Sequence, residues 1–340
     1  MSELPPIEEF WAEKGFPPND AQKRAILHTD GPLFLTAGPG SGKTRVLLWR
    51  TLNLIVYHNV NPEKIFLATF TEKAAAQLRD GLLSLLGMVT NRTGKPYDIS
   101  NMALGTAHSI CQKIITDRYL NEGMERRRPP ILLDDLGQYF RVFNRKYWNK
   151  LCIGAGYEDD ESANVDINDF FSTKANAKGS QSRHIAVTSV IGLFNRLSEE
   201  MLDPDICDLT DVDIANKETL TRLITMYKIY LEDLNTTPRH VDGLRGVRKY
   251  PETNTLPTQP TFRVVDFSLL QKAAHEQLNE FKGSSEIYKH VIVDEYQDTN
   301  AIQEKIYFKL ARGFKNICVV GDDDQALYRF RGATKEKNYP

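Results

Sequence analysis

The stretch AGPGSGKT, from Ala37 to Thr44, decides the fold, because it joins an apolar run to a segment with helical periodicity. The run before it, PLFLT (32–36), is typical of a buried strand, and residues 43–58 follow as the helix. Three glycines within the stretch allow the backbone to curl so that successive N–H groups face inward. These donors and the positive end of the following helix can bind phosphate oxygens, so the setting predicts a P-loop.

A P-loop binds the triphosphate of a nucleotide, and its residues take separate roles. Lys43 would reach the β- and γ-phosphates, and the Thr44 hydroxyl would be a ligand of Mg²⁺. The strict pattern begins with glycine, and Ala37 in that place is a minor variant. The alternative is a glycine-rich turn followed by a chance Lys-Thr pair. The loop residues predicted to bind the nucleotide are Ala37, Gly38, Pro39, Gly40, Ser41, Gly42, Lys43 and Thr44.

A pair of acids, Asp294 and Glu295, ends a second apolar strand pattern, HVIVDE (290–295). Asp294 would hold Mg²⁺ through water, and Glu295 would polarise the attacking water. The alternative is a pair of solvated acids after a strand, and the pair by itself is a weak signal. Joined to the P-loop, it predicts the second half of a nucleoside triphosphate site, in which Glu295 and Lys43 are catalytic and Thr44 and Asp294 bind the metal.

The rest of the chain predicts one α/β domain interrupted by a helical insertion. Helical stretches separate the strand candidates in the first 120 residues, and no strand pattern stands out between 120 and 255. We therefore expect a parallel sheet built from residues 1–118 and 256–340, with a mostly helical subdomain at 119–255. The strand candidates are PLFLT (32–36), IFLAT (65–69), MALGT (102–106), HVIVDE (290–295) and NICVVGDDD (316–324).

Composition excludes several classes of protein. With 41% apolar and 26% charged residues in 340, the chain is an ordinary globular one. The net charge of −2 supplies no global field for nucleic acid, so any such site must be a local patch. No apolar run is long enough for a membrane span, and the N-terminus resembles no signal peptide, so we expect a cytoplasmic protein. Four widely spaced cysteines predict buried reduced thiols.

Several motifs resemble those of superfamily 1 helicases of the UvrD/Rep/PcrA type. Their order and spacing match that family, and the resemblance covers roughly residues 15–120 and 263–333. It implies a RecA-like P-loop NTPase domain, termed 1A, with the helical subdomain 1B inserted. Besides the P-loop, the matching motifs are the Q motif PNDAQKRAI (18–26), motif Ia TFTEKAAAQL (69–78), motif Ib GTAHS (105–109), motif II DEYQDTN (294–300) and motif III VGDDDQALYRFRGA (320–333).

The resemblance also assigns roles around the nucleotide, which it implies to be ATP with Mg²⁺. Gln22 would hydrogen-bond the adenine edge, since an amide can donate to N7 and accept from N6 at once. Arg45 would lie against the nucleotide. Gln325 would contact the γ-phosphate and sense its hydrolysis. Asp266 and Phe267 match a motif that is usually structural.

Single-stranded DNA is the second implied ligand, together with the junction of single and double strands. Aromatic side chains of the matching motifs would stack on bases, and such stacking does not depend on the DNA sequence. Thr106 and His108 would contact the phosphate backbone, and Arg331 would add a cation. The aromatic positions are Phe70, Tyr328 and Phe330.

Each of these DNA assignments has a simpler alternative. Phe70 and Phe330 could be core aromatics, and His108 a satisfied core histidine. The basic run Arg126 to Arg128 is most simply a solvated face, with contact to duplex DNA as the alternative.

The chain also departs from the family. Motif III ends near Ala333, whereas the family continues into a second motor domain, 2A, which carries motifs IV to VI and the arginines that stabilise the transition state. We therefore expect weak ATP binding and slow hydrolysis, if any. Whether the chain is an expressed fragment or a natural truncation stays open. Ala107 stands where an aromatic is more usual, and Glu72 where asparagine is common.

Three hypotheses for function follow. The first is the ATP- and single-stranded-DNA-binding half of an ATP-dependent 3′-to-5′ helicase or translocase, completed by domain 2A. The second is a nucleotide-gated DNA-binding or regulatory module without motor activity. The third is the helicase part of a helicase–nuclease. The pathway, DNA repair among others, stays open.

Overall fold

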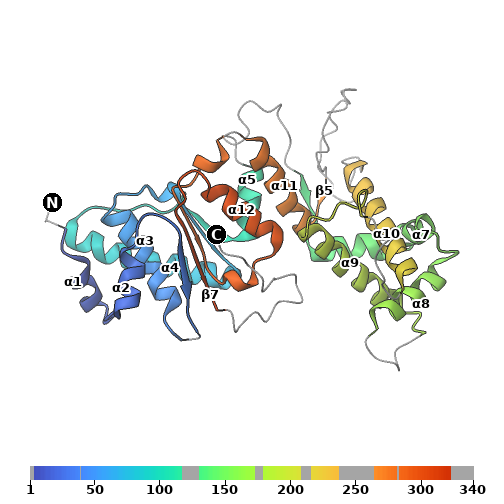
Figure 1. The fold of residues 1–340 in the computed structure, drawn as a ribbon, viewed down its shortest axis with the longest axis horizontal. Helices are drawn as coiled ribbons and strands as arrows, with labels where there is room; N and C mark the ends of the chain where they lie inside the picture. Colours follow the sequence, from blue (N-terminus) through green and yellow to red (C-terminus); the bar gives the residue numbers. More distant parts are fainter. Residues whose placement is uncertain are drawn as a thin grey trace, which may run out of the picture. The chain divides into compact units, whose positions relative to one another are not determined.

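The computed structural model describes residues 4–38, 40–116, 130–172, 179–207, 216–236, 264–281 and 283–322. The chain forms two compact units, the first from Met1–Glu122 with Ala274–Pro340, the second from Gly123–Ala273 (Figure 1). The domain limits predicted from sequence, at 118/119 and 255/256, both lie outside the described residues.

The first unit is built on a five-stranded parallel sheet in the order β1-β7-β6-β2-β3 (Figure 1). All five strand candidates are confirmed, although the last strand ends at Gly321 rather than at residue 324. Because every pair is parallel, the carboxyl ends of all five strands lie at the same edge. The strands are β1 (Leu33–Thr36), β2 (Ile65–Thr69), β3 (Ala103–Thr106), β6 (His290–Val293) and β7 (Ile317–Gly321).

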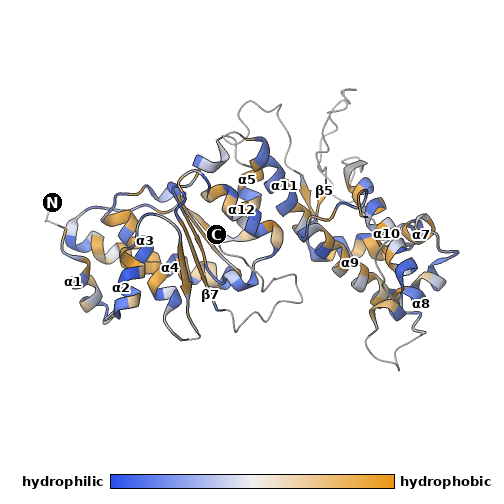
Figure 2. Ribbon diagram, in the orientation of Figure 1, coloured by the Kyte–Doolittle hydropathy of each residue, from blue (hydrophilic) through white to orange (hydrophobic). Residues whose placement is uncertain are grey.

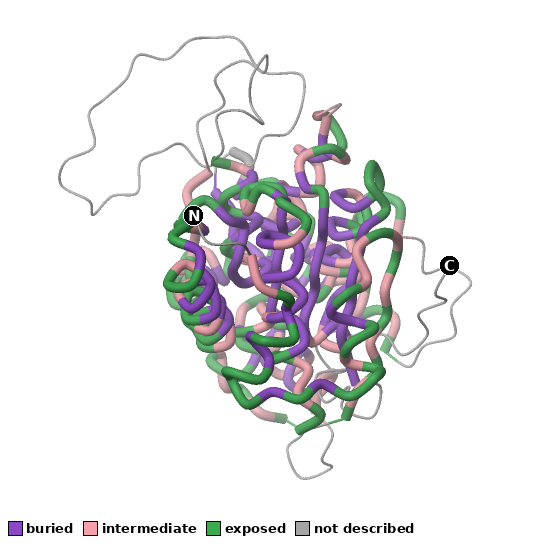
Figure 3. The backbone as a smooth tube through the Cα atoms, turned by 90° about the vertical axis from the view of Figure 1, so that its left-hand side faces the viewer, coloured by how far each residue is buried: buried purple, intermediate pink, exposed green. Residues whose placement is uncertain are grey.

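Helices cover both faces of this sheet, which explains why its strands are continuous apolar runs. Every residue of β2, β3, β6 and β7 is buried. The sheet is largely orange in Figure 2, and the interior of the chain is purple in Figure 3. In the edge strand β1, by contrast, half-buried and exposed residues alternate. On one face lie α1 (Ile7–Glu13), α2 (Asp20–Leu27), α3 (Lys43–Val56) and α4 (Glu72–Thr93), and on the other α5 (Ala107–Thr116) and α12 (Ala301–Ala311) (Figure 1).

Short 3₁₀ turns complete this unit at η1 (Pro62–Lys64), η3 (Ser284–Glu286) and η4 (Tyr296–Asp298). Helix α11 (Phe267–Glu280) begins in the second unit and ends in the first. Among the described residues, no helix combines the length and apolar character needed to span a membrane. All four cysteines are free thiols. Cys111, Cys152 and Cys318 are buried as predicted, whereas Cys207 is only half buried.

The described residues of the second unit are mostly helical, as the sequence predicts, with one exception among them. Its helices are α6 (Asp135–Phe143), α7 (Arg145–Gly154), α8 (Asp160–Phe171), α9 (Arg183–Glu199) and α10 (Lys217–Thr236). The exception is a parallel pair of two-residue strands, β4 (Ile131–Leu132) and β5 (Val264–Val265). The expectation of no strand between 120 and 255 is therefore wrong at β4. Two residues are too few to show the alternation that marks a strand in sequence.

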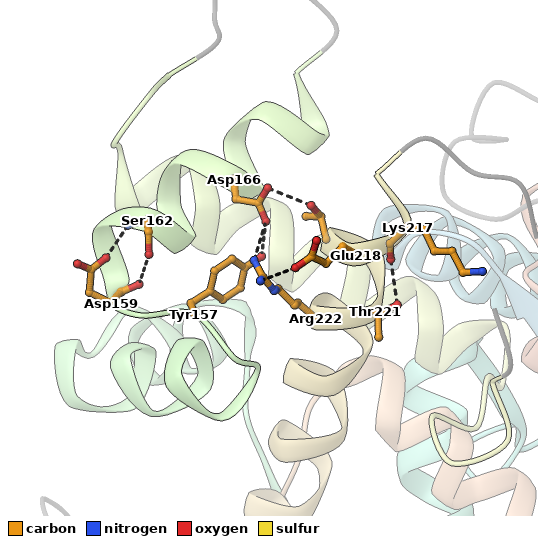
Figure 4. A network of polar contacts seen from close by, with 9 residues as sticks. Tyr157, Asp159, Ser162, Asp166, Lys217, Glu218, Thr221 and Arg222 are labelled. Atoms are coloured by element: carbon orange, nitrogen blue, oxygen red, sulfur yellow. Dashed lines mark hydrogen bonds and ion pairs between the residues drawn. The ribbon is translucent and has the colours of Figure 1, made fainter. Parts of the chain in front are cut away.

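A polar network centred on Asp166 joins α8 to α10 in this unit (Figure 4). The Tyr157 and Thr219 hydroxyls donate to the two Asp166 oxygens, at 2.7 and 3.0 Å. Arg222 lies 4.0 Å from the same carboxylate, and its guanidinium stacks over the Tyr157 ring at 4.7 Å. The Asp166 carboxylate thus binds two groups of α10, Thr219 and Arg222, and the Tyr157 hydroxyl, which precedes α8.

Replacing Asp166 should therefore destabilise the second unit. Asp166→Ala leaves two hydroxyls and a guanidinium without their shared acceptor, which we expect to lower the free energy of unfolding by about 1–2 kcal/mol. Denaturant unfolding followed by circular dichroism measures the loss. Glu161→Ala, at an exposed position of the same helix, is the matched control and should change little. Equal stability of the two variants would contradict the role given to the network.

Candidate nucleotide site

The predicted P-loop leaves the sheet at the carboxyl end of β1 and enters α3 at Lys43. The Ala37 N–H donates to the Gly321 carbonyl at 3.2 Å, which anchors the start of the loop to β7. Gly40 and Gly42 have φ of 72° and 84°, in the left-handed region that disfavours side chains. Gly42 is also the N-cap of α3, so the free N–H groups at the start of this helix point into the loop. Pro39 lies outside the described residues.

The acid pair directly follows β6, at the same edge of the sheet. Asp294 is only 7% exposed, and its N–H donates to the Ala68 carbonyl of β2 at 2.8 Å. The next residue, Glu295, has φ 51° and ψ 47°, a left-handed conformation that is uncommon for a residue with a side chain. The chain therefore turns sharply after β6.

This turn brings the acid pair to the P-loop. The Lys43 ammonium lies 3.8 Å from a carboxylate oxygen of Glu295. The two residues follow β1 and β6, which are not neighbours in the sheet, because β7 lies between them. Lys43, Asp294 and Glu295 thus share one site. Thr44, the predicted metal ligand, is exposed in the first turn of α3.

The electrostatics of the site favour a bound cation. Burial, and after it the Glu295 carboxylate, raise the pKa of Asp294 to about 6, whereas Lys43 lowers it. A buried carboxylate that is costly to ionise gains most from a divalent ion, and carboxylate and hydroxyl oxygens are the ligands that Mg²⁺ prefers. The donor set of Asp294 and Thr44 therefore suits Mg²⁺, and the glycine-lined loop suits a phosphate chain.

Gln22, the predicted adenine reader, already uses both ends of its amide within the protein. Its oxygen accepts from the Asn19 N–H at 3.0 Å in a capping box at the start of α2. Its nitrogen donates to the Ser41 carbonyl of the P-loop at 3.0 Å. Adenine recognition would therefore use the remaining N–H and lone pair, or exchange one of these contacts.

Arg45 is exposed and its guanidinium lies 5.8 Å from the centre of the Phe16 ring. Phe16 in turn stacks on Trp49 of α3, with the ring centroids 6.1 Å apart and the ring planes nearly parallel. No motif in the sequence marks Phe16 as a neighbour of the site. Its position results from the packing of α1, α2 and α3.

The predicted DNA-binding residues that the structure describes lie at the same edge, beyond β2 and β3. Phe70 directly follows β2, and His108 is in the first turn of α5; both are partly exposed. Thr106 ends β3, and its hydroxyl donates to the Glu72 carboxylate at 2.8 Å. Gln325, Tyr328, Phe330 and Arg331, and the basic run at 126–128, lie outside the described residues.

A cavity of about 400 Å³, lined in part by Glu72, lies between α4, β3 and α5. Two cations on its wall already bind backbone: Arg79 donates to the Leu104 carbonyl at 2.9 Å and Lys113 to the Asn101 carbonyl at 3.1 Å. Sequence reasoning missed both residues and the contact between Glu72 and Thr106, because all three depend on how α4 and α5 pack against β3.

Comparison with known proteins gives a consistent result. The family model described as the UvrD/REP helicase N-terminal domain matches residues 18–339. The chain is 26% identical to a probable DNA helicase II homolog of Rickettsia conorii, over 93% of this chain and 38% of the relative. It is 30% identical to the ATP-dependent DNA helicase SRS2 of Saccharomyces cerevisiae, over 93% of this chain and 23% of the relative. It is 28% identical to the ATP-dependent DNA helicase PcrA of Bacillus subtilis, over 95% of this chain and 36% of the relative. The chain thus spans less than two fifths of the length of these relatives.

The raised pKa of Asp294 makes a prediction for stability. A carboxyl whose folded pKa lies above its unfolded value of 3.8 stabilises the folded protein below about pH 4, and this contribution is lost as pH rises through about 6. In Mg²⁺-free buffer, Asp294→Asn should therefore be more stable than the unaltered protein at pH 7, by about 1–3 kcal/mol. The difference should shrink toward pH 4. Denaturant unfolding at several pH values measures it, and a gain that does not depend on pH would contradict the assignment.

Proposed function

The chain belongs to the UvrD/REP helicase N-terminal domain family, and from this premise we propose that it is the ATP- and DNA-binding half of an ATP-dependent 3′-to-5′ DNA helicase. The observation that carries the proposal is the approach of Lys43 to Glu295, 3.8 Å apart beside the buried Asp294. A P-loop lysine, a metal-binding acid and a general base within one site are the parts that nucleoside triphosphate hydrolysis needs.

Nucleotide binding, in this proposal, exchanges the partners of Lys43. The ammonium leaves Glu295 for the β- and γ-phosphates, and the N–H groups at the start of α3 bind phosphate oxygens. Thr44 and Asp294 would hold Mg²⁺, which neutralises phosphate charge when bound. Glu295, released from Lys43, is then able to accept a proton from the attacking water. Gln22 and Arg45 would contact the nucleoside.

Single-stranded DNA, or the junction of single and double strands, would lie across the carboxyl ends of β2 and β3. Phe70 would stack on bases, and Thr106 and His108 would contact phosphates. Binding of a phosphate by Thr106 would require a change of partner, because the Thr106 hydroxyl donates to Glu72 and cannot donate to a phosphate at the same time. A second motor domain of the family's 2A type is the proposed partner that supplies the arginines for fast hydrolysis. The cytoplasmic location stays a prediction from sequence.

Two substitutions separate binding from hydrolysis. Lys43→Ala should weaken the binding of ATP with Mg²⁺ by at least about tenfold, since it removes a charge-assisted contact with the phosphates. Glu295→Gln should retain binding and abolish hydrolysis. Fluorescence titration with a labelled ATP analogue and single-turnover hydrolysis of radiolabelled ATP measure the two steps. Unchanged affinity in Lys43→Ala, or unchanged hydrolysis in Glu295→Gln, would overturn the proposal.

A third substitution tests the DNA surface. Glu72→Gln removes a negative charge beside the proposed phosphate path, and exposed charges contribute up to about 1 kcal/mol, so affinity for oligothymidylate should rise about two- to fivefold. Fluorescence anisotropy at two salt concentrations measures the change.

The matched control for this test is Glu63→Gln. Glu63 also accepts a side-chain hydrogen bond, from Asn101 at 2.9 Å, but it precedes β2 and so lies at the opposite edge of the sheet. Equal effects of the two substitutions would mean that DNA does not pass Glu72.

A further inference from the structure

Gln297 contacts the proposed general base directly. It lies in η4, the 3₁₀ turn that follows the left-handed residue Glu295. This turn folds the chain back, so that the Gln297 side-chain nitrogen donates to a Glu295 carboxylate oxygen at 2.7 Å. The same oxygen is the one that lies 3.8 Å from the Lys43 ammonium. Glu295 thus has two partners, a cation and an amide.

The other end of the Gln297 amide is bonded to β7. Its oxygen accepts from the Asp322 N–H, directly after that strand, at 3.1 Å. A backbone N–H can only donate, so this contact determines which end of the amide is the oxygen. The NH₂ group must therefore face Glu295. The amide orientation that the carboxylate needs is imposed from a different segment of the chain.

A glycine makes room for this bridge. Gly321 is the last residue of β7, and a Cβ atom built there would lie 2.9 Å from the Gln297 side-chain oxygen and 3.4 Å from its backbone nitrogen. The first distance is shorter than a Cβ contact tolerates, so any larger residue would displace the amide. Glycine at the end of β7 therefore leaves the space that the Gln297 amide occupies.

We propose that Gln297 is a positioning residue that holds the Glu295 carboxylate in place for catalysis and ties it to the end of β7. The inference rests on the proposed function, in which Lys43 leaves Glu295 for the phosphates. Once Lys43 has moved, the Gln297 amide is the partner that keeps Glu295 oriented. Because the bridge ends at Asp322, a movement of the β7 end would also move the base.

The first experiment tests the bridge without nucleotide. In protein labelled with ¹⁵N at glutamine side chains, the Gln297 NH₂ resonance is identified by its loss in Gln297→Met. That resonance should shift in Glu295→Ala and in Gly321→Ala, because one removes the acceptor and the other displaces the amide. An unchanged resonance in both variants would overturn the inference, whatever the protein does with ATP.

The second experiment tests the consequence for catalysis. Gln297→Met keeps the side-chain volume but loses both hydrogen bonds, whereas Gln297→Glu keeps the acceptor for Asp322 and places a carboxylate against Glu295. Both should slow single-turnover ATP hydrolysis by about 10- to 100-fold, as small misplacements of a catalytic group do, with the Kd for ATP unchanged. A merely structural role would instead lower stability and affinity together.

The controls separate this inference from the proposed function. Gln112→Met and Gln112→Glu make the same changes at an exposed position of α5 and should leave hydrolysis unchanged. Adding Gly321→Ala to Gln297→Met should slow ATP hydrolysis little further, since both substitutions disrupt the same contact. Hydrolysis that Glu295→Gln abolishes but both Gln297 variants retain would overturn the inference and leave the proposed function intact. If the unaltered protein hydrolyses no ATP, as expected without the arginines of a second motor domain, the loss of ATP binding in Lys43→Ala tests the proposed function and the NMR result decides on the bridge.

Discussion

Parallel pairing of β1, β7 and β6 is the constraint on which the site depends. It places the carboxyl ends of three strands, distant in sequence, at one edge. The P-loop leaves β1 there and the acid pair leaves β6, so Lys43 reaches Glu295 across the width of the intervening strand. Helices on both faces bury the strands, which keeps this edge rigid while its loops carry the chemistry.

The polar groups of the site are already satisfied before any ligand binds. Lys43 pairs with Glu295, the Gln22 amide bonds to Ser41 and Asn19, and Thr106 donates to Glu72. Ligand binding to such a site exchanges partners rather than filling vacant ones, so affinity is the difference between two sets of contacts. Asp294 accepts from the Glu295 N–H at 3.1 Å, but burial still makes its charge costly, and a metal ion would relieve that cost.

Backbone conformation supports this arrangement at a few positions. Gly40 and Gly42 take left-handed φ values that open the P-loop, and Glu295 takes one despite its side chain. The cost of the left-handed turn at Glu295 is of the order of 1 kcal/mol. In return the turn points the carboxylate at Lys43 and brings Gln297 back against it.

Local patterns in the sequence determined the P-loop, the five strands and the acid pair, because each depends on a few adjacent residues and a regular period. The two-residue strand β4 has no period, and packing alone creates it. Tertiary structure alone decided the contacts of Lys43 with Glu295, of Gln22 with Ser41 and of Gln297 with Asp322. Each joins segments far apart along the chain, at distances that only the register of the sheet and the packing of its helices determine.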